Sequence, residues 1–147
     1  MSRVEKIWIK RMRRGPMDPV DRARVIAGKG IVGNANQRGK RQVTIVSSKH
    51  WRDVTAPLGA APDPTVRRAN LLVTDIDFSQ ARGKILKVGA VRLRVYGETR
   101  PCEQMEDAAP GLQSAMSIPW GGGAFAEVLD DGEIAIGDPV VLEDSPT

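Results

Sequence analysis

The chain has 147 residues, 41% of them hydrophobic, which suffices for one compact domain and is short for two. No apolar run reaches the roughly 20 residues that span a bilayer, and the charge-rich residues 1–14 do not fit a secretory signal. With a single cysteine, we expect one domain over residues 1–147, its core at about 28–142, in the reducing cytoplasm and without a membrane partner.

The net charge of +4 hides an uneven distribution along the chain. Residues 1–52 carry 14 Lys and Arg against 3 Asp and Glu, a net of +11, whereas residues 53–147 carry 8 against 15, a net of −7. If its charges converge in space, the basic half suits an anion such as phosphate or nucleic acid. Alternatively, the two halves pair with each other. The sequence leaves both interpretations open.

In the first half of the chain, two β-strands and one helix are predicted. Residues 6–10 alternate around Ile7 and Ile9, and residues 42–47 are β-branched, which is typical of a mostly buried strand. Ser47 or Ser48 then caps a helix that runs through about Val54. Between the two strands, residues 28–37 form a segment rich in glycine and carboxamides.

The second half is predicted to contain further short strands, at 70–74, 85–88, 91–96 and 140–142. Gly89 and Ala90 indicate one hairpin, and residues 130–132 indicate a second and clearer one between strands 124–129 and 133–136. Brief helices are predicted at 101–108 and 110–116, and residues after about 142 as a frayed tail. Many short strands with few helices predict a mainly β protein, a closed or nearly closed β-barrel with a few short helices.

Several polar positions are candidates for a binding site, each with a plainer alternative. The glycine-rich segment can cradle an anion through its backbone N–H groups, although it lacks a Walker motif and fits a simple turn better. Arg68 can present a planar fork to a phosphate, with Asn70 beside it, or form a surface ion pair with an aspartate. His50 has no triad or zinc partner in the sequence and is expected to be structural.

Cys102 is the only cysteine, so its chemistry would involve a thiolate, a persulfide or a metal–sulfur bond. Arg100, and a helix beginning after Pro101, would favour the thiolate. Glu98 and Glu103 oppose it. The alternative is an inert packing residue.

Together, five segments resemble the MOSC domain, the molybdenum-cofactor sulfurase C-terminal domain family, from about Gly28 to Val141. They are Gly30-Ile31-Val32-Gly33-Asn34, Arg41-Gln42-Val43-Thr44-Ile45, Arg68-Ala69-Asn70-Leu71-Leu72-Val73, Arg100-Pro101-Cys102-Glu103-Gln104-Met105, and the ending from Gly122 to Leu129 and Gly137 to Val140. No single segment is diagnostic, but their order and the placement of the cysteine are shared.

The resemblance implies a β-barrel that handles the molybdenum cofactor (molybdopterin), a pterin dithiolene with a terminal phosphate. Cys102 would carry persulfide sulfur or bind molybdenum, Arg68 and Asn70 would hold the cofactor, and Lys40, Arg41 and Thr44 would face it. The implied chemistry is sulfur transfer or molybdenum-dependent reduction of N-hydroxylated compounds. The implied partners are a sulfur donor or acceptor enzyme and an electron-donor protein. Pyridoxal phosphate would be bound by a separate sulfurase partner and not by this chain.

One departure from the family pattern matters. Members often carry Asp and His where this chain has Asn34 and Asn36, which leaves open a role in cofactor binding or sulfur carriage without turnover, or a non-catalytic domain that docks to a partner enzyme. A further alternative is a basic barrel that binds nucleic acid through Arg11, Arg13, Arg14, Arg38, Lys40 and Arg41. Six aromatic residues are few for base stacking, so nucleic acid is disfavoured.

Overall fold

A computed structural model describes residues 2–12, 16–35, 42–56, 69–99, 120 and 123–143 of the chain. This part contains eleven strands and one helix: β1 (Val4–Lys10), β2 (Met17–Val20), β3 (Arg22–Ile26), β4 (Gly30–Ile31), β5 (Val43–Ser47), α1 (Ser48–Thr55), β6 (Leu71–Val73), β7 (Ile85–Val88), β8 (Val91–Glu98), β9 (Ala124–Val128), β10 (Gly132–Ala135) and β11 (Val140–Glu143). The prediction of a mainly β protein is therefore confirmed.

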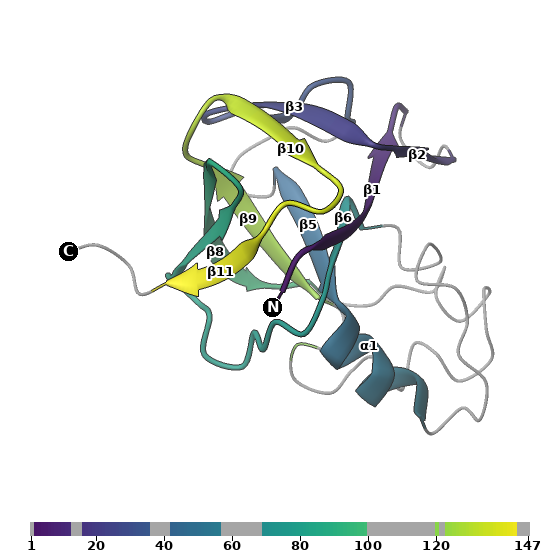
Figure 1. The fold of residues 1–147 in the computed structure, drawn as a ribbon, viewed down its shortest axis with the longest axis vertical. Coiled ribbons are helices and arrows are strands. Elements are labelled where there is room, and N and C mark those ends of the chain that lie inside the picture. The colour runs from purple at the N-terminus through teal and green to yellow at the C-terminus, as the bar shows by residue number, and fades with distance from the viewer. Residues whose placement is uncertain are drawn as a thin grey trace.

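The strands form two sheets. The larger has eight strands in the order β11-β7-β8-β9-β5-β6-β1-β2, and the smaller has three in the order β10-β3-β4. Among the described strands only β5 and β6 pair in parallel, with Ile45 opposite Leu71. Figure 1 shows β3 and β10 across the top of the molecule and α1 at the opposite end. The strands that precede Gly28 thus belong to the same sheets as those that follow it.

The eight-stranded sheet curves until its β11 and β1 regions meet, but it does not close. Arg3 and Pro139 form one isolated bridge. Beside it, the Val4 N–H donates to the Asp138 carbonyl at 2.9 Å and the Gly137 N–H donates to the Val4 carbonyl at 2.8 Å. Neither sheet closes on itself within the described residues. The predicted closed barrel is therefore not confirmed.

Two apolar clusters lie on opposite faces of the β5–β6–β1 region. The main core contains every second residue of these strands, including Ile7, Ile45 and Leu71, each at most 1% exposed. The intervening residues Trp8, Val46 and Leu72 pack with Trp51 and Val54 of α1 in a smaller cluster. The alternation follows from the two-residue period of a β-strand, and it makes α1 the cover of the outer face.

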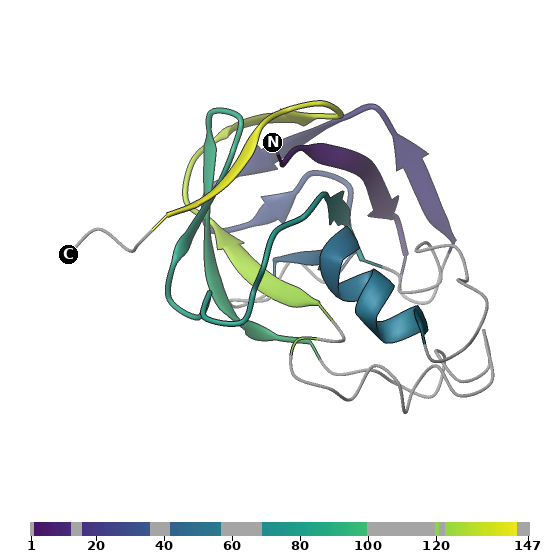
Figure 2. The same cartoon turned by 60° about the horizontal axis from the view of Figure 1, so that its bottom comes forward.

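The single described helix begins where the sequence predicts. Ser47 is the N-cap, and its side chain accepts a hydrogen bond from the Lys49 N–H at 3.3 Å. His50, Trp51, Val54 and Thr55 are its buried residues. Figure 2 brings α1 forward and shows it lying against one side of the sheets.

None of the described residues belongs to a helix that is both long enough and apolar enough to cross a membrane.

Of the two predicted hairpins, one is confirmed and one is wrong. β7 and β8 pair around Gly89 and Ala90, with Val88 opposite Val91. β9 instead pairs with β5 and β8, and β10 pairs with β3 in the other sheet. The turn residues explain the difference, because Asp130 binds Arg92 and Asp131 accepts from the Ala27 N–H at 2.8 Å. The turn therefore carries the chain from one sheet to the other.

Other predictions fall beyond the described ranges or need extension. The predicted helices at 101–108 and 110–116 lie outside the described residues. β2, β3 and β4 were not predicted. β2 contains Asp18 and Pro19, and β4 has only two residues, of which the first is glycine. β3 alternates arginine with apolar residues, and this strand pattern was missed. β11 continues to Glu143, one residue past the predicted strand end.

Candidate functional site

The described part of the site is a group of three polar residues at the starts of β5 and β6. Thr44 is the second residue of β5, Asn70 directly precedes β6, and Asn34 lies in the turn that follows β4. We call Asn34, Thr44 and Asn70 the polar node. The Asn70 residue is only 4% exposed, so its amide needs protein partners.

Asn70 joins three strands through its side chain. Its Oδ1 accepts from the Thr44 N–H at 3.1 Å and from the Thr44 hydroxyl at 3.3 Å. Its Nδ2 donates to the Trp8 carbonyl at 3.2 Å and to Asn34 Oδ1 at 2.9 Å. The backbone N–H of Asn70 in turn donates to Thr44 Oγ1 at 3.1 Å. Thr44 and Asn70, for which the family resemblance implies cofactor binding, thus lie in direct contact.

Asn34 connects this pair to the end of β1. Its Oδ1 accepts a second hydrogen bond from the Lys10 N–H at 2.9 Å, and its Nδ2 donates to the Ala35 carbonyl at 2.8 Å. The Ala35 N–H donates back to the Lys10 carbonyl at 2.6 Å. Sequence reasoning considered Asn34 only as the replacement of an acid and missed this structural role, which depends on contacts between distant segments.

The described part of the glycine-rich segment, residues 28–35, consists of a short strand and a turn. Gly30 has φ +115°, and a Cβ there would lie 2.9 Å from the Gln42 carbonyl oxygen. The Val32 N–H donates to the Arg24 carbonyl at 2.9 Å. Glycine is therefore required at position 30 for close packing of β4 against the start of β5. This supports the simpler interpretation of the segment as a turn.

Two described residues lead directly to predicted basic ligands. Gln42 follows Arg41 in the chain and Ala69 follows Arg68, and these positions precede β5 and β6. Because β5 and β6 are parallel, their N-terminal ends lie at the same end of the sheet. Lys40, Arg41, Arg68 and Cys102 themselves lie outside the described residues, so the structure places only Thr44 and Asn70 of the predicted site.

Thr99, which directly follows β8, is the last described residue before Cys102 in the chain. Thr99 is 2% exposed, and its N–H donates to the Gly123 carbonyl at 2.9 Å. Gly123 has φ +91°, and a Cβ there would lie 2.4 Å from the Ile45 carbonyl oxygen. The end of β8, the start of β9 and the middle of β5 are therefore in close backbone contact.

His50 has the structural role that the sequence predicts. Its Nε2 accepts from the Phe78 N–H at 2.9 Å, and its ring stacks on Phe78 with centroids 5.9 Å apart. Phe78 stacks in turn on Trp120, and the Arg82 guanidinium lies 5.9 Å from the Trp120 ring centroid. Burial lowers the pKa of His50 below its ordinary value of 6.5, so the neutral ring that can accept the Phe78 N–H is favoured.

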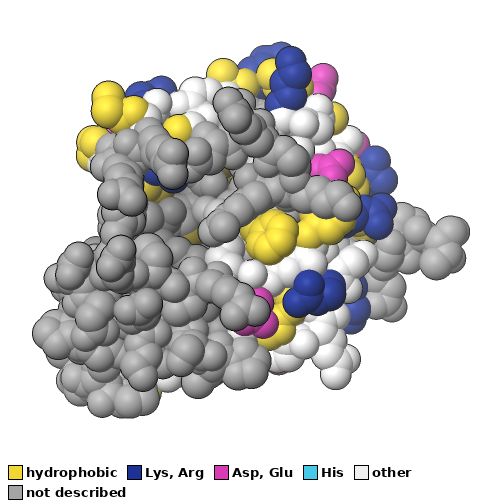
Figure 3. Space-filling model, turned by 180° about the vertical axis from the view of Figure 1, so that it is seen from behind, with side chains coloured by type: hydrophobic (Ala, Val, Ile, Leu, Met, Phe, Trp, Pro, Cys, Tyr) yellow, Lys and Arg dark blue, Asp and Glu magenta, His cyan; other side chains and the backbone are white. Residues whose placement is uncertain are grey.

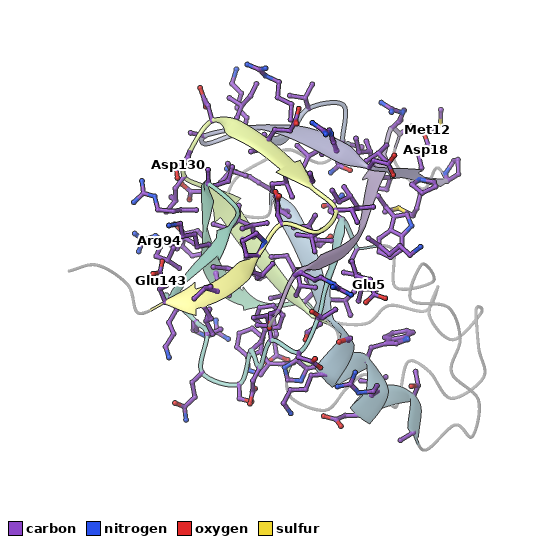
Figure 4. All side chains as sticks on the ribbon, in the orientation of Figure 1. Glu5, Met12, Asp18, Arg94, Asp130 and Glu143 are labelled. Carbon is purple, nitrogen blue, oxygen red and sulfur yellow. The ribbon has the colours of Figure 1, made fainter. Side chains whose placement is uncertain are left out.

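The charge asymmetry of the sequence is partly neutralised by ion pairs. Arg22 pairs with Glu133 at 3.2 Å and Arg52 with Asp75 at 2.8 Å, so both link the basic half to the acidic half. Figure 3 shows basic and acidic side chains interspersed on the face seen from behind. Asp130, which binds Arg92 through both carboxylate oxygens, points outward on the same side as Arg94 (Figure 4). At least two arginines of the basic half, Arg22 and Arg52, therefore pair with carboxylates of the acidic half.

Within the described ranges, no three His, Cys, Asp or Glu side chains are grouped as ligands for a metal ion. The one predicted metal ligand, Cys102, lies outside these ranges.

Solved structures with the same fold cover nearly the whole chain. The YuaD protein of Bacillus subtilis superposes with a TM-score of 0.82 at 20% identity, covering 99% of this chain and 98% of that one. YiiM of Geobacillus stearothermophilus has a TM-score of 0.73 at 17% identity, covering 97% and 75%. YiiM of Escherichia coli has a TM-score of 0.66 at 18% identity, covering 99% and 71%. The TM-scores show that these proteins share the fold of this chain.

No curated protein matches the sequence significantly. The model of the MOSC domain matches residues 23–141, which is most of the chain and includes the polar node and Cys102. The chain belongs to the MOSC domain family.

Proposed function

We propose that this MOSC-domain protein binds the molybdenum cofactor, or carries sulfur on Cys102, for sulfur transfer or for molybdenum-dependent reduction of N-hydroxylated compounds. The observation that carries the proposal is the parallel pairing of β5 with β6. This pairing brings the residues that directly precede the two strands to the same end of the sheet. Arg41 and Arg68 are two and three positions from the β5 and β6 starts, respectively.

Convergence of basic side chains at one side of a sheet favours an anion with several oxygens. Lys40, Arg41 and Arg68 would together supply three positive charges, and the guanidinium groups can each donate two parallel hydrogen bonds to a phosphate. The terminal phosphate of molybdopterin is such a group. We therefore assign the charged contacts of the proposed site to Lys40, Arg41 and Arg68.

Chain length allows Cys102 to reach β5. Cys102 lies three positions after Thr99, and three extended residues span about 10 Å. Thr99 directly follows β8, which lies two strands from β5, and two strand spacings also amount to about 10 Å. Because Thr99 bonds to Gly123 and Ala124 pairs with Ile45, Thr99 is level with Val46 and not with the start of β5. A thiolate is a soft ligand that suits molybdenum or sulfane sulfur. Cys102 is thus within reach of the middle of β5, and we propose it as the sulfur-bearing residue, with a sulfur donor or an electron-donor protein as its partner.

The two described site residues do not fit a direct role in holding the cofactor. Both N–H donors of the Asn70 amide and the Thr44 hydroxyl donate to protein acceptors. An anion at this point would find no free donor from either side chain. We therefore derive no reaction step through these two residues.

The test of the proposed function compares wild type with Cys102→Ser, both purified from a host that makes the cofactor. Molybdenum and pterin are measured in each, together with protein-bound persulfide. Loss of molybdenum in Cys102→Ser is expected for direct ligation, and loss of persulfide for sulfur carriage. Equal molybdenum and no persulfide in either protein would contradict both.

The charged contacts are tested by Arg68→Ala, for which Arg22→Ala is a matched control. Both variants remove one positive charge, but Arg22 lies on β3 and pairs with Glu133. Pterin content is expected to fall in Arg68→Ala and to stay at the wild-type level in Arg22→Ala. An equal fall in both variants would mean that net charge, and not Arg68, determines loading.

A carrier or docking role without turnover is favoured by one observation at Asn34. Its amide has no titratable proton, and both of its polar atoms are used in hydrogen bonds to Lys10, Ala35 and Asn70. Proton transfer at this position is therefore not available to the chain. An assay of N-hydroxylated substrates with the loaded protein and a chemical reductant separates the two roles.

A further inference from the structure

We infer that Asn34 is a positioning residue, which holds Asn70 and Thr44 so that the segments bearing Lys40, Arg41 and Arg68 start from fixed points. The inference deepens the proposed function and rests on it. It also reassigns Thr44 and Asn70, which fix the strand starts and do not contact the bound anion.

The side chains of Asn70 and Thr44 have no free hydrogen-bond donor for a ligand. The side-chain oxygen of Asn70, Oδ1, has two acceptor positions, which the Thr44 N–H and hydroxyl occupy. The side-chain NH₂ of Asn70 has two donors, which bond to the Trp8 carbonyl and to Asn34 Oδ1. The single Thr44 hydroxyl donor is used by Asn70. Binding an anion here would break at least one of these bonds in a buried setting, where an unmade hydrogen bond is costly.

Asn34 is the member of the node that connects the turn after β4 to the strands. Its Oδ1 accepts from Asn70 Nδ2 and from the Lys10 N–H, so one atom links β1 to the residue before β6. Asn70 passes this constraint to β5 through Thr44. Loss of Asn34 Oδ1 would leave two donors without their acceptor and free the Asn70 side chain to rotate. The starts of β5 and β6 would then lose a shared constraint.

The side-chain oxygen and nitrogen of Asn34 make different hydrogen bonds, so their contributions can be tested with different substitutions. An aspartate at position 34 would keep both accepted hydrogen bonds, but it would lose the donation from Nδ2 to the Ala35 carbonyl at 2.8 Å and place a carboxylate oxygen there instead. An alanine would lose all three. Asn34→Asp is therefore the conservative variant that should restore what Asn34→Ala removes, if the oxygen performs the positioning.

The experiment compares wild type, Asn34→Ala, Asn34→Asp and a control, Ile134→Val. Ile134 is fully buried on β10 in the other sheet, so this variant loosens the core without touching the node. Amide hydrogen exchange is followed at Lys10 and Thr44, and pterin content is measured after purification from a cofactor-producing host. In Asn34→Ala, exchange at both amides is expected to be about tenfold faster, and pterin content to fall severalfold. Asn34→Asp should return both to near wild type, and Ile134→Val should keep its pterin.

Three results would overturn the inference: unchanged exchange at Lys10 and Thr44 in Asn34→Ala, failure of Asn34→Asp to restore it, or full pterin content in Asn34→Ala. The last would mean that any contact from Asn70 or Thr44 to the cofactor is independent of Asn34. If wild type contains no pterin, the proposed function fails. The exchange measurements would still decide whether Asn34 holds the strand starts.

Discussion

Several single residues of this chain are fixed by backbone geometry instead of side-chain chemistry. Gly123 and Gly137 both adopt left-handed backbone conformations, with φ +91° and +94°. A Cβ on Gly123 would lie 2.4 Å from the Ile45 carbonyl oxygen, whereas a Cβ on Gly137 would meet nothing within 4 Å. The two positions therefore separate the cost of the conformation from the cost of steric overlap.

We predict that Gly123→Ala destabilises the protein by at least about 3 kcal/mol and Gly137→Ala by about 1–2 kcal/mol. The smaller value is the cost of a left-handed conformation for a residue with a Cβ. The excess at Gly123 comes from displacing the backbone of β5. Urea unfolding measures both free energies. Similar losses in the two variants would show that β5 and Gly123 are less closely packed than the structure indicates.

At the scale of elements, His50 joins α1 to the segment between β6 and β7. Its Nε2 accepts the Phe78 N–H, and Phe78 lies between the rings of His50 and Trp120. The charged groups near His50 are Asp77, Lys49 and Asp53. Burial is the largest influence on the His50 pKa and lowers it, and it outweighs the opposing effect of Asp77. The contact therefore requires an unprotonated ring.

This geometry predicts that folding stability falls in acid because of His50. Its folded pKa is lower than its unfolded pKa, so its contribution is fully present above the ordinary value of 6.5 and is lost as pH falls through the folded pKa. The free energy of unfolding of wild type should decrease from pH 7.5 to pH 5. His50→Gln, whose side-chain oxygen can accept the Phe78 N–H at any pH, should show a smaller decrease. Parallel pH profiles for the two proteins would contradict the assignment.

At the scale of the whole molecule, the two ends of the described chain hold the curved sheet together. The Thr74 N–H donates to the Arg3 carbonyl at 3.0 Å, and the Val140 N–H donates to the Ser2 carbonyl at 3.0 Å. These bonds link residues 2–3 to β6 on one side and β11 on the other. They occupy the place at which the sheet would close.

We predict that a variant beginning at Val4, without residues 1–3, exchanges the Thr74 and Val140 amide hydrogens about tenfold faster than wild type. Each of these amides loses its acceptor. The Val95 N–H, which donates to the Lys84 carbonyl within the β7–β8 hairpin, serves as the internal control. Native-state hydrogen exchange measures all three. Unchanged protection at Thr74 and Val140 would show that residues 2–3 do not hold the sheet.

Local sequence signals were sufficient for elements that depend on nearby residues. The β-branched run predicted β5, Ser47 predicted the start of α1, and Gly89 and Ala90 predicted the β7–β8 hairpin. The order of motifs identified the family. The family resemblance implied that Thr44 and Asn70 belong to one site, and the structure places them in contact.

Only the tertiary structure decided which strands pair and which polar atoms are used. Residues 130–132 have the composition of a hairpin turn, yet Asp130 and Asp131 bind Arg92 and Ala27, so β9 and β10 enter different sheets. The Asn70 amide contacts Trp8, 62 positions away, and Asn34, 36 positions away. Local propensity and spacing carry no information on partners at such separations. The sequence therefore determined the strands and the family, and packing between distant segments determined the role of each polar side chain.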